Sequence, residues 1–144
     1  MTESLQVETV VSVTDADAVA IERLLDQLSS SATFDRSSIE RMLDHDATEL
    51  LVVRLDGDIV GMATLVSFPS PSGSRGFVED VVTDVSARGR GIGRLLLKAM
   101  VDIAVRRGLR SLELTSRPSR EAALRLYESV GFVRRDTNVL RFTP

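Results

Sequence analysis

The spacing of hydrophobic positions changes several times along the first third of the chain, and each change predicts a new element. Apolar and polar residues alternate over residues 5–13, which predicts a half-buried strand. Thr14 then favours a helix start, and apolar residues recur near helical spacing as far as Leu28 and the serines at 29–31. A second short helix is predicted over residues 37–43.

Two apolar strands are predicted next, over residues 49–55 and 59–68. The residues between them, Asp56, Gly57 and Asp58, favour a tight hairpin turn. Residues 68–74 are rich in proline and serine and are typical of a loop.

The second half alternates between strand and helix patterns. Its predicted elements are strand 77–83, helix 92–107, strand 111–115, helix 119–129 and a closing strand pair, 132–135 with 139–142. Two consecutive strand–helix units predict a parallel strand pair at the centre of the sheet. The fold class is therefore α/β: a single domain over residues 1–144, with a mixed sheet and helices on both faces.

Composition removes several chemistries. The chain has no cysteine and one histidine, His45, which excludes disulfides, thiol nucleophiles and histidine-rich metal centres, so no metal is expected. No apolar run approaches the ~18 residues of a membrane span. Residues 1–4 are polar with one acidic side chain, unlike a secretory signal, and a cytoplasmic location is expected.

Charge is distributed unevenly. Residues 1–75 hold 5 basic and 13 acidic side chains, whereas residues 76–144 hold 13 basic and 8 acidic ones. This asymmetry is compatible with a polyanion bound by the second half and, weakly, with a cation bound by the first. On the charge asymmetry alone, however, solvated surfaces are the favoured interpretation. Nucleic-acid binding is not expected, since aromatic residues make up only 4% of the chain.

A glycine- and arginine-rich turn separates strand 77–83 from helix 92–107. Its sequence is Arg88, Gly89, Arg90, Gly91, Ile92, Gly93, Arg94. Glycines allow close approach to backbone N–H groups at the positive end of a helix, where arginines are unfavourable unless an anion is present. The segment therefore predicts a pyrophosphate site. The spacing fits neither the G-x-G-x-x-G dinucleotide motif nor a Walker A loop.

Three segments carry a family resemblance. Arg88-x-x-Gly91-x-Gly93 resembles the R/Q-x-x-G-x-G/A signature of the GCN5-related N-acetyltransferases (GNAT family). Residues 78–83 resemble the bulged fourth strand of that family, and residues 126–132 its later LYE-x-x-GF motif. The order of elements also matches over essentially the whole chain.

The resemblance implies acetyl-CoA as cosubstrate and a GNAT-type fold. In similar proteins the fourth strand binds the pantetheine arm through its backbone, which maps to Val81, Val82 and Thr83. The pyrophosphate maps to the whole turn from Arg88 to Arg94. Backbone N–H groups of the strand would also stabilise a developing oxyanion.

Tyr127 is the only tyrosine in the chain. In similar enzymes the tyrosine at this position protonates the departing thiolate, so the resemblance implies a general acid. The alternative is a tyrosine held by the packing of its ring.

Glu79 and Asp80 are adjacent carboxylates in an otherwise apolar strand. Burial would raise a carboxylate pKa toward the range of a base that assists deprotonation of an ammonium group. A salt-bridged or bulge-capping role is the alternative. Glu79 is the weakly preferred base.

One departure from the family pattern concerns the cofactor, and three segments concern the acceptor. Many relatives have asparagine seven residues before the tyrosine, where this chain has Arg120, which would meet a cofactor phosphate or be solvated. Acceptor specificity is expected from residues 29–34, the loop 69–74 and the closing hairpin, where Asn138 is a further candidate.

The leading hypothesis is an acetyl-CoA-dependent N-acetyltransferase that modifies a primary amine by direct attack in a ternary complex. The alternative is a non-catalytic acyl-CoA-binding or sensor domain. The acceptor is not identified. Family members often pair through sheet edges or C-terminal strands, which makes a homodimer an expectation.

Overall fold

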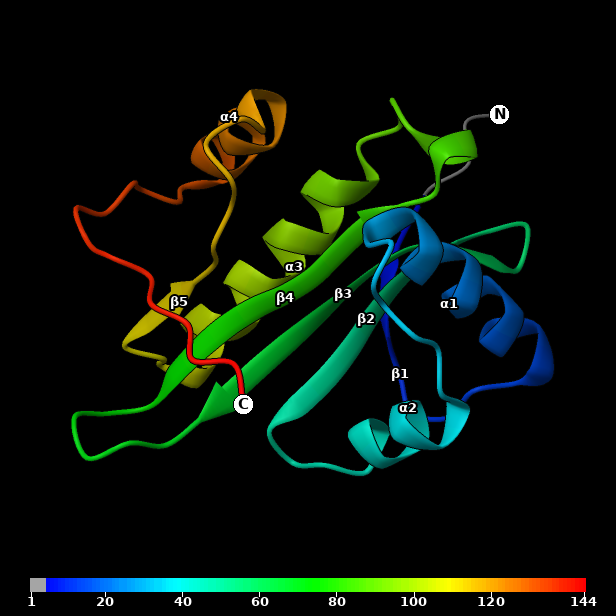
Figure 1. Ribbon diagram of the computed structural model, residues 1–144, viewed down its shortest axis with the longest axis horizontal. Coiled ribbons are helices and arrows are strands. Elements are labelled where there is room, and N and C mark those ends of the chain that lie inside the picture. Colours follow the sequence, from blue (N-terminus) through cyan, green and yellow to red (C-terminus); the bar gives the residue numbers. More distant parts are fainter. Residues whose placement is uncertain (1–4) are drawn as a thin grey trace.

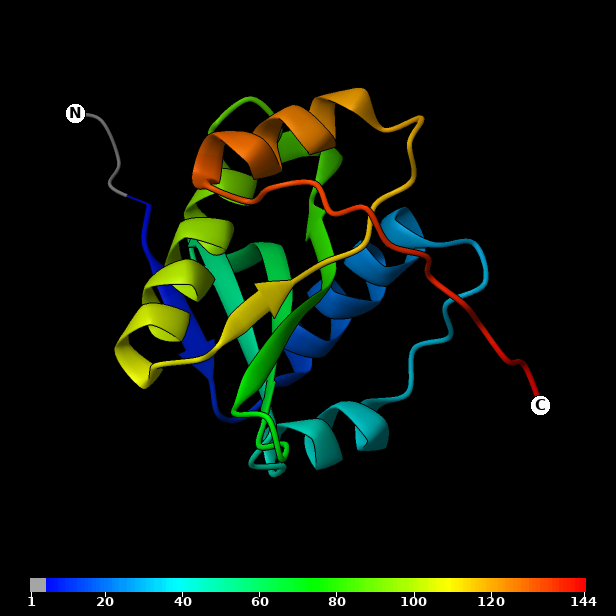
Figure 2. The same ribbon diagram turned by 90° about the vertical axis from the view of Figure 1, so that its left-hand side faces the viewer.

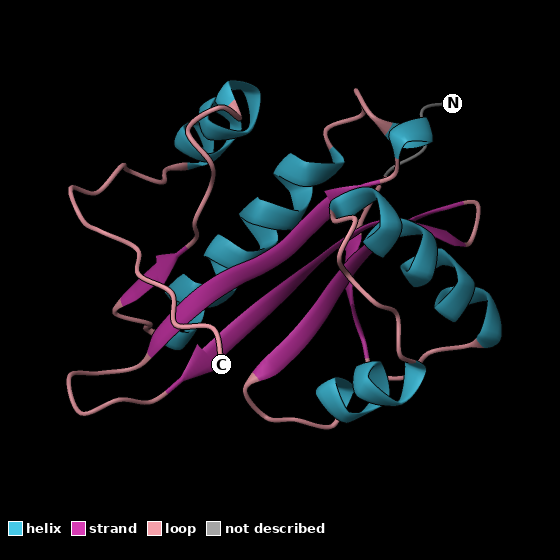
Figure 3. Ribbon diagram, in the orientation of Figure 1, coloured by secondary structure: helices cyan, strands magenta, loops and turns pink. Residues whose placement is uncertain are grey.

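The computed structural model describes residues 5–144; residues 1–4, on which the expected location partly rests, lie outside them. The elements are β1 Val7–Val10, α1 Asp15–Leu28, α2 Arg36–Leu43, β2 Thr48–Leu55, β3 Asp58–Phe68, β4 Arg75–Thr83, η1 Val85–Ala87, α3 Ile92–Arg107, β5 Ser111–Glu113 and α4 Glu121–Val130. Figure 3 shows their distribution. The helices and the first five predicted strands are confirmed, with ends shifted by up to three residues.

The five strands form one sheet in chain order, β1-β2-β3-β4-β5. The first four pair antiparallel, and β5 pairs parallel with β4 over Arg75↔Ser111 to Phe77↔Glu113. The mixed, mostly antiparallel sheet and the parallel pair are thus confirmed. The predicted central position of this pair is wrong: the pair lies at one edge of the sheet, because no strand follows β5 in the described residues.

Helices cover both faces of the sheet, with α1 and α2 on one side and α3 and α4 on the other (Figures 1 and 2). The core is accordingly divided by the sheet into two clusters. The α1 side buries, among others, Val10, Ile21, Leu24, Leu50, Val52, Ile59, Met62 and Val82. The α3 side buries Leu51, Val53, Ala63, Leu65, Val78, Ile92, Leu96, Leu97 and Met100.

Local sequence explains the helix ends and the hairpin. Thr14 closes a capping box with Asp17 at the start of α1, and Asp35 caps α2. Between β2 and β3, Asp56 and Gly57 both have positive φ, 52° and 87°, as the tight turn requires.

A β-bulge interrupts β4 at Asp80. Met62 pairs with Val82 and Thr64 with Glu79, so two residues of β4 oppose the single residue between them on β3. Asp80 has φ 52°, a left-handed conformation that aspartate tolerates better than most residues. The bulge reverses the alternation of faces: Val78 packs on the α3 side, whereas Val82 packs on the α1 side.

The predicted closing strands, 132–135 and 139–142, are wrong. Residues 132–144 form no strand, and Val133, Leu140 and Phe142 are 82%, 91% and 88% exposed. Alternation shows only that one face of a segment can be buried; a strand also needs a hydrogen-bonded partner. Side-chain ion pairs hold this segment instead, Arg134 to Glu128 and Arg135 to Glu113.

Over residues 5–144, no helix combines the length and apolar character that crossing a bilayer requires. In the same residues, no group of three or more histidine or acidic side chains is placed to hold a metal ion.

Candidate active site

A cleft of about 950 Å³ opens where β4 and β5 part. The parallel ladder ends at Phe77↔Glu113, so residues 78–83 have no β5 partner. The end of α1, the segment after β5, α4 and the C-terminal segment complete the walls. The lining residues are Gln27, Leu28, Ser29, Ser30, Val81, Val82, Thr83, Arg88, Gly93, Thr115, Ser116, Arg117, Arg120, Ala123, Leu126, Tyr127, Val139 and Arg141.

The turn before α3 presents unpaired backbone donors. Gly91, the residue just before α3, has φ 76°, and no side chain caps the start of the helix. The first intrahelical bond here runs from the Leu95 N–H to the Gly91 carbonyl, 3.0 Å, which leaves the preceding N–H groups of the helix without helical acceptors. The first turn carries no acidic residue. These features fit a bound anion such as a pyrophosphate.

Only part of that turn faces the cleft. Arg88 and Gly93 line it, whereas Gly89, Arg90, Gly91, Ile92 and Arg94 do not. Ile92 is buried in the core, and Arg94 donates to the Ser129 hydroxyl at 2.8 Å. A Cβ on Gly93 would lie 3.4 Å from Leu126 Cδ2, so the absence of a side chain there lets α3 and α4 approach closely.

The end of β4 and Tyr127 share the cleft. Val81, Val82 and Thr83 line one wall and Tyr127 the other. The Tyr127 ring is half-buried and packs edge-to-face on Phe132, with ring centroids 6.4 Å apart. Among residues 5–144, its hydroxyl makes no hydrogen bond, so the group is available to a ligand.

Glu79 and Asp80 do not line the cleft. Both are exposed, and Glu79 precedes the bulge on the face opposite Val78, the side that α1 covers. Partial removal from water, and then the neighbouring Asp80 carboxylate, raise the pKa of the Glu79 carboxyl. A contact between Glu79 and a group in the cleft therefore requires an intervening water.

Several lining residues were not expected from the sequence. Thr115, Ser116 and Arg117 follow β5, and the Ser116 hydroxyl is buried without a hydrogen-bond partner. The rule that ligands bind beyond the carboxyl ends of parallel strands could have found them. Arg120, noted as a departure from the family pattern, also lines the cleft.

The expected acceptor segments are only partly at the cleft. Ser29 and Ser30 line it, as do Val139 and Arg141, whereas Asn138 is exposed and outside the lining. The loop 69–74 is also outside it. That loop packs on Arg110, which donates to the Ser72 carbonyl.

The end of α1 is tied to the turn below the cleft. Arg23 Nε donates to Asp84 Oδ2 at 2.7 Å, and the Val85 N–H donates to Gln27 Oε1 at 2.9 Å. Asp84 is buried and caps η1; the Ser86 backbone N–H, followed by Arg23, lowers the pKa of the Asp84 carboxyl to about 2. This network fixes the cleft wall formed by α1.

Sequence comparison identifies the family. The profile described as "Acetyltransferase (GNAT) family" matches residues 19–132, most of the chain. The chain therefore belongs to the GNAT acetyltransferase family, which confirms the resemblance described above.

Individual relatives and structures agree with this assignment. The chain is 33% identical over 135 residues to the N-alpha-acetyltransferase RimI of Mycobacterium tuberculosis, covering 93% of this chain and 84% of that protein. It is 35% identical over 99 residues to the mycothiol acetyltransferase of Thermomonospora curvata, covering 69% of this chain and 32% of that protein. The chain thus spans about a third of the length of that relative. The crystal structure of a Trypanosoma brucei acetyltransferase superposes with a TM-score of 0.80 at 26% identity, covering 98% of this chain and 100% of that chain.

Proposed function

We propose that the protein is an acetyl-CoA-dependent N-acetyltransferase that modifies a primary amine by direct attack in a ternary complex. The observation that carries this proposal is the shared cleft. It joins the unpaired edge of β4, Arg88 of the uncapped turn and Tyr127. Family membership supports the same activity.

The chain offers a fitting site for the cosubstrate. Arg88 and the free N–H group of Gly93, which line the cleft, would hold the pyrophosphate, with Gly89, Arg90, Gly91, Ile92 and Arg94 shaping the turn. Backbone groups of Val81, Val82 and Thr83 would hold the pantetheine arm. The bound thioester supplies the activated acetyl group.

Tyr127 would act as the general acid. As the amine nitrogen bonds to the carbonyl carbon and the carbon–sulfur bond breaks, the Tyr127 hydroxyl would give its proton to the leaving thiolate, and the proton lost by the acylated nitrogen would restore the hydroxyl through water. Backbone N–H groups near the bulge would stabilise the negative charge that develops on the carbonyl oxygen.

Glu79 is the preferred base, with Asp80 as the alternative. The raised pKa of Glu79 makes it the better proton acceptor of the two. It would take a proton from the amine through water, because neither carboxylate lines the cleft.

A non-catalytic acyl-CoA sensor remains the second candidate, since the same cleft would bind the cosubstrate without turnover. A Tyr127→Phe variant separates the two. For an enzyme we expect turnover to fall by ~10²- to 10⁴-fold, the usual contribution of a general acid, while acetyl-CoA still stabilises the protein. Thermal shifts with acetyl-CoA, CoA and 3′-dephospho-CoA, together with thiol release over a panel of amines, measure both properties.

A ligand at 100 times its Kd adds about 2.7 kcal/mol to the stability, which is well within detection. Absence of a shift with every CoA species would refute the cosubstrate assignment. A shift without thiol release from any amine would favour the sensor. A homodimer, a cytoplasmic location and the lack of nucleic-acid or membrane partners stay predictions.

A further inference from the structure

All the charged side chains that line the cleft are positively charged. Four arginines line it, Arg88, Arg117, Arg120 and Arg141, and no aspartate or glutamate does. Within the described residues, none of the four forms an ion pair. The acidic side chains of α1, such as Glu22, are outside the lining. Four uncompensated guanidinium groups around one cavity favour a strongly anionic content.

The uncharged polar groups of the lining add further donors. Thr115, Ser29 and Ser30 contribute hydroxyls, whereas the Ser116 hydroxyl is buried with no partner in the protein. Gln27 already uses its amide oxygen to accept from the Val85 N–H, which leaves its NH₂ group to face a ligand. A cationic substrate would find no carboxylate here to replace its water.

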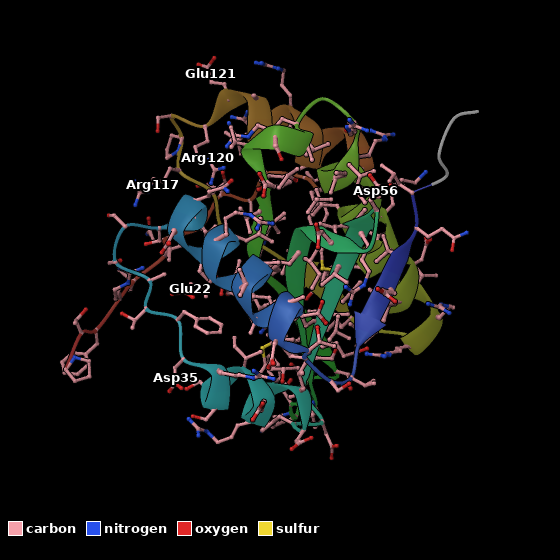
Figure 4. All side chains as sticks on the ribbon, turned by 90° about the vertical axis from the view of Figure 1, so that its right-hand side faces the viewer. Glu22, Asp35, Asp56, Arg117, Arg120 and Glu121 are labelled. Carbon is pink, nitrogen blue, oxygen red and sulfur yellow. The ribbon has the colours of Figure 1, made fainter. Side chains whose placement is uncertain are left out.

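The arginines are not gathered at the pyrophosphate turn. Arg88 belongs to that turn, and Arg117 and Arg120 lie on the segment that leads into α4, on the side where α1 ends (Figure 4). Arg141 comes from the C-terminal segment, which lies away from the turn in both views of the ribbon (Figures 1 and 2). The phosphates of a bound CoA would therefore account for Arg88 but leave Arg141 without an anion.

We propose that the acceptor is a small amine that also carries a carboxylate or a phosphate, and that Arg141 binds this anionic group. The inference rests on the proposed function and names the substrate class of the same site. It reverses the weak expectation of a cationic acceptor from the acidic first half of the chain, because those acidic side chains do not line the cleft. A cleft of about 950 Å³ that must also hold the thioester arm leaves room for a small acceptor.

The test uses amines that differ only in the anionic group. β-Alanine is compared with β-alaninamide, O-phosphoethanolamine with ethanolamine, and putrescine represents a cationic acceptor. Binding to the CoA-saturated protein is measured by thermal shift, and acetyl transfer by thiol release. The two acidic amines distinguish a carboxylate from a phosphate acceptor. Arg141→Gln removes the charge, Arg141→Lys retains it, and Arg106→Gln, an exposed arginine of α3 outside the cleft, is the matched control.

We expect an acidic amine to bind and react better than its uncharged partner. Arg141→Gln should lower kcat/KM for the acidic amine by ~10- to 100-fold, the loss of a charge-assisted contact, and leave the uncharged partner within ~3-fold. Arg141→Lys should recover part of this loss, and Arg106→Gln should change neither value.

Three results would overturn the inference: equal or better binding of putrescine or the uncharged amines, no binding of any panel amine to the CoA complex, or a loss of CoA affinity in Arg141→Gln. Failure of acetyl-CoA itself to stabilise the protein would instead refute the proposed function, so the two failures are distinguishable.

Discussion

The first hundred residues and the last forty contribute differently to the molecule. Every buried residue of the described chain lies between Val10 and Ala104, and none lies within residues 105–144. Yet the last forty residues provide half of the cleft lining, including Tyr127 and Arg141. The first region therefore forms the packed scaffold, and the second forms one wall of the cleft from half-buried and exposed residues that pack on this scaffold.

The difference teaches where precision and adaptability are located. Close-packed interiors hold backbone positions tightly, so the edge of β4 and the turn at Arg88 are fixed by the core beneath them. A wall of half-buried residues tolerates sequence change more readily, and ligand-binding segments are commonly drawn from such regions. The cosubstrate side of the cleft is thus the rigid one, and the α4 side with the C-terminal segment is the one suited to variation in the acceptor.

The largest expected effect tests the scaffold against the wall. Leu97 is fully buried under the sheet, and we expect Leu97→Ala to cost about 2–5 kcal/mol of unfolding free energy. Leu124 of α4 is only half-buried, and Leu124→Ala should cost about 1–2 kcal/mol. Urea unfolding of both variants measures the contrast. Equal losses would show that the wall is part of the same packed unit.

The next effect concerns the turn at the border of the two regions. Arg88→Ala should raise the Kd of acetyl-CoA by ~10- to 100-fold, since a charged hydrogen bond to a phosphate is worth about 1.5–3 kcal/mol. Stability without ligand should stay unchanged, because Arg88 is exposed and has no ion-pair partner in the described residues. Isothermal titration gives the Kd, with Arg106→Ala as control. Unaltered affinity would remove Arg88 from the site.

The smallest effect probes the link from α1 to the turn through pH. Asp84 has a pKa of about 2 in the folded protein against an ordinary value of 3.8, so its contribution is present above pH 4 and is lost as the pH falls toward 2. Arg23 is 44% exposed, which limits its share of the gain. Asp84→Asn should lower the unfolding free energy by about 1–2 kcal/mol at pH 7. Denaturant unfolding from pH 7 to pH 2 follows the difference, which should shrink toward the acid end; a constant difference would contradict this origin.

Local patterns predicted most of the scaffold. The capping residue Thr14, the Asp56-Gly57 turn and the apolar stripe of α3 are short-range signals, and each element appears close to its expected bounds. The closing strands failed because pairing depends on a partner elsewhere in space, which alternation within residues 132–142 does not encode. Side-chain ion pairs such as Arg135 to Glu113 were equally invisible, since they join distant positions.

The site was predictable only where it is continuous in sequence. The turn at residues 88–94 and the strand end at 81–83 are uninterrupted segments, whereas the cleft gathers residues from six parts of the chain. The presence of Tyr127 and the β4 edge at the same cleft was predicted only through the family motif. That Arg141 and Ser116 line one cleft follows only from the structure, in which β4 and β5 part.

The bulge at Asp80 determines which side chains of β4 point to each face of the sheet. Because β4 has one extra residue here, side chains that would otherwise share a face lie on opposite faces of the sheet before and after the bulge. A substitution at Asp80 keeps the number of residues in β4, and it therefore keeps the face to which each neighbouring side chain points. Deleting the residue would instead turn Val81, Val82 and Thr83 to the opposite faces of the sheet, which would exchange core-facing and cleft-facing positions. The length of this strand is therefore more constrained than its composition.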